Sequence, residues 1–151
     1  MSTSAPTTNE KRPIRLGWEE GAIVVASTDE GRFEQQVRGS LAACRDGSSV
    51  SRTIERFKSE FLPLVRRWCE AHRELVRSCY IPMSSRPLCV FVVSRKTKYD
   101  FSLSDPAADL EMELFRMNWP VEVLHVPSGS PESLRSLFDP TDSVEVYGDA
   151  G

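Results

Sequence analysis

The chain has 151 residues, of which 40% are apolar and 27% charged, and its formal net charge is −3. This composition is typical of a globular protein and excludes a disordered, collagen-like or membrane-embedded chain. The length suits one domain with a core of its own.

Residues 1–15 are polar, without periodicity, and predict a flexible tail ahead of one domain spanning residues 16–151. The tail lacks the apolar run of a secretory signal. The longest apolar runs, 22–26 and 88–93, are too short to cross a bilayer. We therefore expect a cytoplasmic protein with no membrane partner.

The first regular elements are a strand and a helix. Residues 22–26 form a short run that is apolar on both faces, which predicts a buried strand. Ser27 and Glu30 have the spacing of a capping box, so a helix should begin at Ser27. Apolar residues then recur at helical spacing: Phe33, Val37, Leu41 and Cys44.

The clearest pattern in the chain predicts a long amphipathic helix over residues 50–77. Its apolar stripe consists of Ile54, Phe57, Phe61, Leu64, Trp68 and Leu75. Pro63 lies inside this stripe and removes one backbone hydrogen bond. Because the stripe keeps its phase across Pro63, we expect one kinked helix rather than two separate helices.

The second half of the chain alternates strands and helices. We expect strands at 79–82, 88–93, 121–126 and 144–147, the first short or at a sheet edge because of Pro82, the second and third buried, and the last at an edge. Helices should begin at Asp105 and Ser130, each a capping residue followed by proline. The order β-α-α-β-β-α-β-α-β predicts an α/β fold with a mixed sheet of about five strands.

Charge is distributed unevenly along the chain. Residues 52–98 hold 11 Lys/Arg and 4 Asp/Glu, whereas residues 99–151 hold 2 Lys/Arg and 11 Asp/Glu. Such a split indicates either basic and acidic segments that face each other, within the fold or across a homodimer, or an exposed anion-binding face. Nucleic-acid binding through residues 52–98 ranks third among the possible functions, because the chain is acidic overall and has no known reader motif.

The sharpest small-molecule hypothesis is an anion site at the carboxyl ends of strands. If the strands that start near residues 22, 88 and 121 are parallel, three loops converge there. The candidate ligand-binding residues in these loops are Thr28, Lys96, Lys98, Asp100, Ser128 and Ser130. A phosphoryl-transfer or other small-ligand enzyme is therefore the second possible function.

Other chemical patterns are weaker. Asp109 and Glu113 lie four apart on one helix, but a metal site needs further ligands. Cys69 and His72 are three apart, without the second pair that zinc requires. His125 lacks a nucleophile placed beside it by sequence, and no G-x-S-x-G motif is present. We therefore expect no cofactor, no metal and no catalytic residue, and four reduced cysteines.

The absence of a catalytic constellation favours an interaction or adaptor protein. Such a protein would act through a protein partner or its own oligomer. Candidate interface residues are three arginines on the predicted long helix and one aromatic residue outside the stripes, which could anchor a partner: Arg66, Arg73, Arg77 and Trp119.

Overall fold

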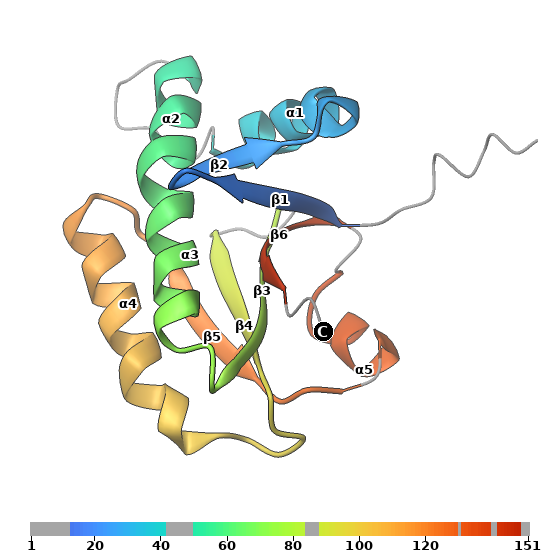
Figure 1. Cartoon of the computed structure of the whole chain (residues 1–151), viewed down its shortest axis with the longest axis vertical. Coiled ribbons are helices and arrows are strands. Elements are labelled where there is room, and N and C mark those ends of the chain that lie inside the picture. Colours follow the sequence, from blue (N-terminus) through green and yellow to red (C-terminus); the bar gives the residue numbers. More distant parts are fainter. Residues whose placement is uncertain (1–12, 42–49, 84–87, 130, 140–141, 149–151) are drawn as a thin grey trace, which may run out of the picture.

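The protein forms one six-stranded mixed sheet with helices packed on it (Figure 1). The computed structural model describes residues 13–41, 50–83, 88–129, 131–139 and 142–148. The strand order is β2-β1-β6-β3-β4-β5. The helix α2–α3 and α4 lie on one side of the sheet and α5 on the other. The α/β class and the mixed sheet are confirmed, with one strand more than expected.

The additional strand is β1 (Ile14–Glu19), which pairs antiparallel with β2 (Ala22–Val25). Glu20 and Gly21 form the two-residue turn between them, and both have positive φ. Such a turn matches the twist of an antiparallel hairpin. Ile14 is fully buried, so the sheet includes residues 14 and 15, which were predicted to belong to the tail.

The helix α1 (Glu30–Leu41) follows a 3-10 turn at Ser27–Asp29. Ala26 precedes this turn, and no side chain caps it. The predicted Ser27–Glu30 capping box is therefore wrong, because the 3-10 turn displaces the start of the α-helix. Phe33, Val37 and Leu41 are buried as predicted; Cys44 lies outside the described residues.

The long amphipathic helix is continuous over α2 (Val50–Arg56), a π-helical turn (Phe57–Phe61) and α3 (Leu62–Ala71). In the π-turn the Leu62 N–H donates to the Phe57 carbonyl, five residues back. One helix therefore runs through Pro63, as expected. Its predicted end at residue 77 is wrong, because β3 (Val76–Pro82) already begins at Val76.

The remaining strands are β4 (Cys89–Ser94), β5 (Glu122–Val126) and β6 (Ser143–Gly148). Four strand positions differ from the prediction. β6 lies between β1 and β3 rather than at an edge, and β3 is also internal, with Pro82 as its last residue. The edges are instead β2 and β5, both predicted to be buried. The apolar sequences of β2 and β5 resemble those of internal strands, although both strands are only partly buried.

The helix α4 (Ser104–Arg116) begins after a 3-10 turn at Phe101–Leu103. The Asp100 carboxylate caps that turn by accepting a hydrogen bond from the Ser102 N–H at 3.0 Å. Asp105 lies in the first turn of α4 and is not its cap, which corrects the prediction. The short helix α5 (Pro131–Arg135) begins at proline, as predicted.

Three aromatic rings fill the core between the long helix and the end of α4. Phe61 stacks on Phe57 with ring centroids 4.8 Å apart, and Trp119 meets Phe61 edge-on at 5.1 Å. Trp119 is only 2% exposed. The prediction that Trp119 anchors an interface is therefore wrong, because its ring completes the core.

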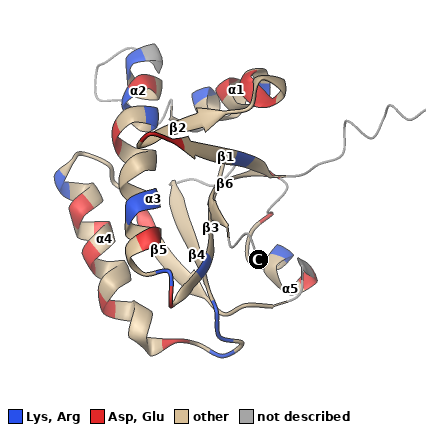
Figure 2. Cartoon of the chain, in the orientation of Figure 1, with Lys and Arg blue, Asp and Glu red and all other residues tan. Residues whose placement is uncertain are grey.

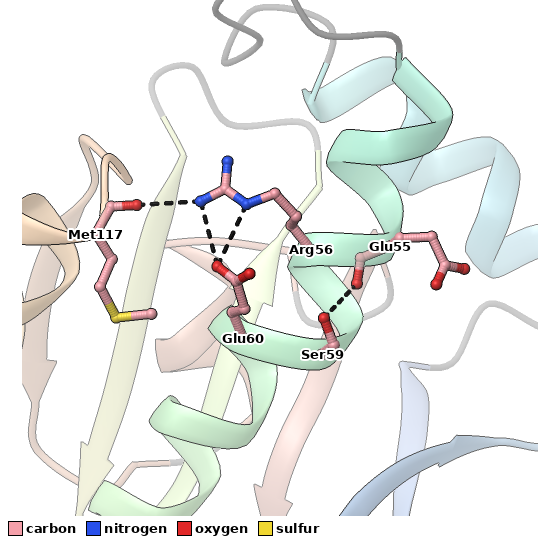
Figure 3. Close-up of polar contacts among 5 residues, drawn as sticks. All are labelled: Glu55, Arg56, Ser59, Glu60 and Met117. Carbon is pink, nitrogen blue, oxygen red and sulfur yellow. Dashed lines mark hydrogen bonds and ion pairs between the residues drawn. The ribbon is translucent and has the colours of Figure 1, made fainter.

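Two side chains of the long helix hold α4 in place. The Arg56 guanidinium donates to the Met117 carbonyl at the C-terminal end of α4 and to the Glu60 carboxylate (Figure 3). At the other end, the Trp68 indole N–H donates to the Pro106 carbonyl at 3.2 Å. A cation at a helix C-terminus is favourable because it complements the helix dipole. α4 is thus fixed at both ends beside β5.

Candidate functional site

The outer edge of β5 ends the sheet. β5 pairs with β4 in parallel along one side, and no described strand lies along the other. The Glu122 N–H donates to the Leu88 carbonyl of the β4 side, so the alternate N–H groups, those of Val123 and His125, point away from β4. An unpaired edge of this kind is a template for another strand unless it is covered.

Exposed apolar side chains gather around this edge. Seven large apolar residues are exposed among those the structure describes, and Val24 on β2 is the one at the opposite edge. The other six lie on α4, on β5 or in the segments beside them: Tyr99, Phe101, Met112, Phe115, Leu124 and Leu137. Such clustering marks an interaction surface, whereas apolar residues scattered singly are ordinary.

Two hollows lie between α4 and β5, one on each side of Glu111. We call them together the α4–β5 groove. The large hollow has a volume of about 550 Å³ and apolar walls formed by Phe91, Ala107, Ala108, Val123, Leu124, Val126 and Leu137. The small hollow, of about 270 Å³, is lined by Glu111, Met112, Phe115, Pro120, Val121 and Glu122.

Glu111 closes the edge between the hollows. Its carboxylate accepts a hydrogen bond from the Val123 N–H at 2.8 Å. This N–H is one of those directed away from β4, so a side chain takes the place of the carbonyl that a further strand would supply. Charged side chains that cover an edge are a common protection against unwanted pairing.

Polar groups converge at the far end of the large hollow. Tyr99 Oη lies 3.0 Å and Ser104 Oγ 3.5 Å from His125 Nε2, and the Tyr99 ring packs on the imidazole. Burial lowers the pKa of His125 below its ordinary value, and the nearby Asp100 carboxylate opposes this shift. His125 is therefore mainly neutral near pH 7.

The predicted anion site is brought together only in part. The Ser128 N–H donates to the Lys96 carbonyl at 2.8 Å, and Lys96 forms an ion pair with Asp100 at 3.8 Å. The loops after the parallel strands β4 and β5 thus meet, as predicted. Thr28 does not join them, because it follows β2, which is the opposite edge strand and runs antiparallel to β4. Lys98 is exposed in the same loop; Ser130 lies outside the described residues.

The predicted interface arginines have different surroundings. Arg66 is half-buried, lies between the rings of Trp18 and Tyr147, and pairs with Glu70 at 3.1 Å. It therefore holds the long helix against β1 and β6. Arg73 and Arg77 are exposed. Arg77 lines a separate hollow of about 280 Å³ with Ser128, beneath α5.

Two ion pairs lie within the basic segment, and the pair of Lys96 and Asp100 joins it to the acidic segment. Arg56 pairs with Glu60 and Arg66 with Glu70, both at helical spacing. Acidic side chains recur along α4 (Figure 2), where Asp105, Asp109 and Glu113 are exposed. The surface next to the α4–β5 groove therefore carries negative charge.

Three cysteines are buried thiols: Cys69, Cys79 and Cys89. Burial is the main cause that raises the pKa of Cys69. In the parts of the chain that the structure describes, no three His, Cys, Asp or Glu side chains gather as a metal site would require. Nor does any helix there have the length and apolar character needed to cross a membrane.

Comparison with known proteins finds no relative of this chain. No protein-family model, no curated protein and no solved structure matches the chain. The α4–β5 groove is therefore the main basis for a functional proposal.

Sequence reasoning missed the residues that form the groove. Met112 and Phe115 lie three apart on α4, outside its buried stripe of Leu110 and Leu114. An apolar pair on the polar side of a helix is a signal that could have been found. The exposure of Leu124 could not, because it depends on β5 being the last strand of the sheet.

Proposed function

We propose that this protein is a non-catalytic interaction module that binds an extended segment of a partner protein along the outer edge of β5. The observation that carries the proposal is the clustering of six exposed apolar side chains around this edge. Adding a strand to a sheet edge gains main-chain hydrogen bonds, and pockets for alternate side chains supply specificity.

The groove is built in advance for such a segment. α4 is fixed at both ends, by Arg56 and by Trp68, so its apolar side chains stay beside β5 without a partner. A surface that is already ordered loses less conformational entropy on binding. The two hollows follow the direction of β5, which suits an extended chain.

A second copy of this chain fits the groove less well than a different partner. Two β5 strands paired across a two-fold axis would place two α4 helices next to each other on one face of the joined sheet. Each α4 carries exposed Asp105, Asp109 and Glu113. Like charges in that arrangement repel, which favours a partner segment without this acidic surface.

The test uses peptides of about nine residues, long enough to span a strand of ordinary length, selected from a random display library against the wild-type protein. Selected peptides should bind the Leu124→Glu and Phe115→Glu variants at least about tenfold more weakly, since each places a charge in an apolar contact. Val24→Glu, an exposed apolar residue on β2, is the matched control and should leave binding unchanged.

Two results would contradict this function. One is a selection that yields no binding peptide. The other is a set of peptides whose affinity for Leu124→Glu equals that for the wild type. Sedimentation of the wild-type protein should show a monomer. A dimer that Leu124→Glu abolishes would mean that a second copy of this chain, and not a different protein, binds the groove.

A small anionic ligand in the large hollow is the second candidate function. It is favoured by Tyr99, Ser104 and His125, which converge where the carboxyl ends of β4 and β5 meet. Phosphate or acetate should then shift the His125 imidazole signals in a saturable way, and Ser104→Ala should weaken the effect. An unchanged His125 spectrum at high anion concentration would remove this candidate.

A further inference from the structure

We infer that the small hollow binds an arginine or lysine side chain of the partner segment, with the cation between Glu111 and Glu122. This inference rests on the proposed function and adds the chemistry of the segment. The hollow is lined by apolar side chains and by two carboxylates.

The lining of the small hollow matches a long basic side chain. Met112, Pro120 and Val121 offer apolar surface for the aliphatic stem, and Phe115, which is 61% exposed, offers a ring face to a cation. A purely apolar side chain would place no cation beside these two carboxylates and would displace water from them, which is unfavourable.

Within the part of the chain that the structure describes, the two carboxylates have no positive partner. No described Lys or Arg lines the small hollow, and neither Glu111 nor Glu122 forms an ion pair with a described basic residue. Glu122 is exposed, and its Oε1 lies 3.9 Å from Cys89 Sγ; Glu111 is half-buried and accepts from the Val123 N–H. The negative charge at this point is therefore available to a cation from outside.

Pairing of a partner strand would release Glu111. A carbonyl of the incoming segment must replace the Glu111 carboxylate as acceptor for the Val123 N–H, because that N–H points to the outer edge. The released carboxylate then needs a new partner next to β5. A basic side chain in the small hollow supplies it, so strand pairing and cation binding support each other.

The two hollows also set a spacing. The small hollow lies beside Val121 and Glu122 and the large hollow beside Leu124 and His125. Alternate residues of a strand point to the same face. The segment should therefore carry an apolar residue two or four positions from its basic residue, with the apolar side chain in the large hollow.

The test is a pair of synthetic peptides of about nine residues. Both alternate threonine and valine, and they differ at one central position, which is arginine in the first and its neutral analogue citrulline in the second. Fluorescence anisotropy should show that the arginine peptide binds about fivefold to tenfold more tightly, as for a partly exposed ion pair, and that salt reduces the difference.

Variants of the protein locate the effect. Glu122→Gln and Glu111→Gln should each reduce the preference for arginine, whereas Glu113→Gln should not, since Glu113 is exposed on α4 but does not line the hollow. Equal binding of the two peptides, no binding of the arginine peptide, or an equal effect of Glu113→Gln would overturn the inference.

The outcomes separate this inference from the proposed function. If Leu124→Glu weakens the binding of both peptides while the arginine and citrulline peptides bind equally well, docking at the β5 edge is supported and the binding of a basic side chain in the small hollow is refuted. If Leu124→Glu changes the binding of neither the library peptides nor the synthetic peptides, the proposed function and this inference are both refuted.

Discussion

Replacing Phe61 by alanine tests the assignment of the core. Phe61 is fully buried and contacts two aromatic rings, that of Phe57 at 4.8 Å and that of Trp119 at 5.1 Å. Phe→Ala changes in cores lower the free energy of unfolding by about 3–5 kcal/mol, and each aromatic pair adds about 0.5–1.5 kcal/mol beyond area. We therefore expect a loss of about 4–5 kcal/mol, a large share of the roughly 5–15 kcal/mol of a whole domain.

The assay is urea unfolding of wild type, Phe61→Ala and a matched control, Phe115→Ala. Phe115 is 61% exposed, so the same truncation there should change the free energy of unfolding by no more than about 0.5 kcal/mol. At this chain length the Phe61→Ala loss corresponds to a fall in Tm of about 8–20 °C. Equal losses for the two variants, or a loss below about 1 kcal/mol for Phe61→Ala, would refute the reasoning.

Three further predictions concern Arg56, His125 and the cysteines. Arg56→Met should cost about 1–2 kcal/mol and speed amide exchange at the C-terminal end of α4, whereas Arg67→Met, which changes an exposed side chain, should do neither. Because the pKa of His125 is lowered in the folded state, the stability that it contributes should be complete above about pH 6.5 and be lost as pH falls below that value; replacing it with asparagine should remove this slope, and NMR titration gives the pKa directly. Thiol titration of the denatured, unreduced protein should count all four cysteines, and native protein should react slowly at the three buried thiols; a count of two would show a disulfide.

Local patterns predicted the helices and most strands. The stripe of Phe57, Phe61 and Trp68 identified the long helix because one face of a helix must be apolar over its whole length to pack on a sheet. Its length was overestimated, because Leu75 continues the helical spacing although the chain has already turned toward β3.

Strand order was the information that sequence did not contain. β6 is internal and β5 is an edge, although both are short and rich in valine. Position in a sheet follows from long-range pairing, which no local pattern encodes. β1 was missed although Ile14, Leu16 and Trp18 alternate along it, because Gly17 and the flanking charges obscured the pattern.

The candidate site, like the fold, was predictable where it depends on local patterns and not where it depends on strand order. The meeting of the loops at Lys96 and Ser128 was predictable, since the strands before them are apolar runs that pair in parallel. The groove was not predictable in full, because it forms between α4 and a strand whose outer edge is exposed. Only tertiary structure joins Met112 and Leu124 into one surface.

Amide hydrogen exchange along β5, with and without a selected peptide, tests docking at this edge most directly. The N–H groups of Val123 and His125 point away from β4, and that of Val123 already donates to Glu111, so a strand paired at the outer edge should slow exchange most at His125. The amide of Val24 at the opposite edge of the sheet should be unaffected. Protection that appears at Val123 and His125 is the result we predict; protection confined to another element, with these two amides unchanged at saturating peptide, would contradict the account.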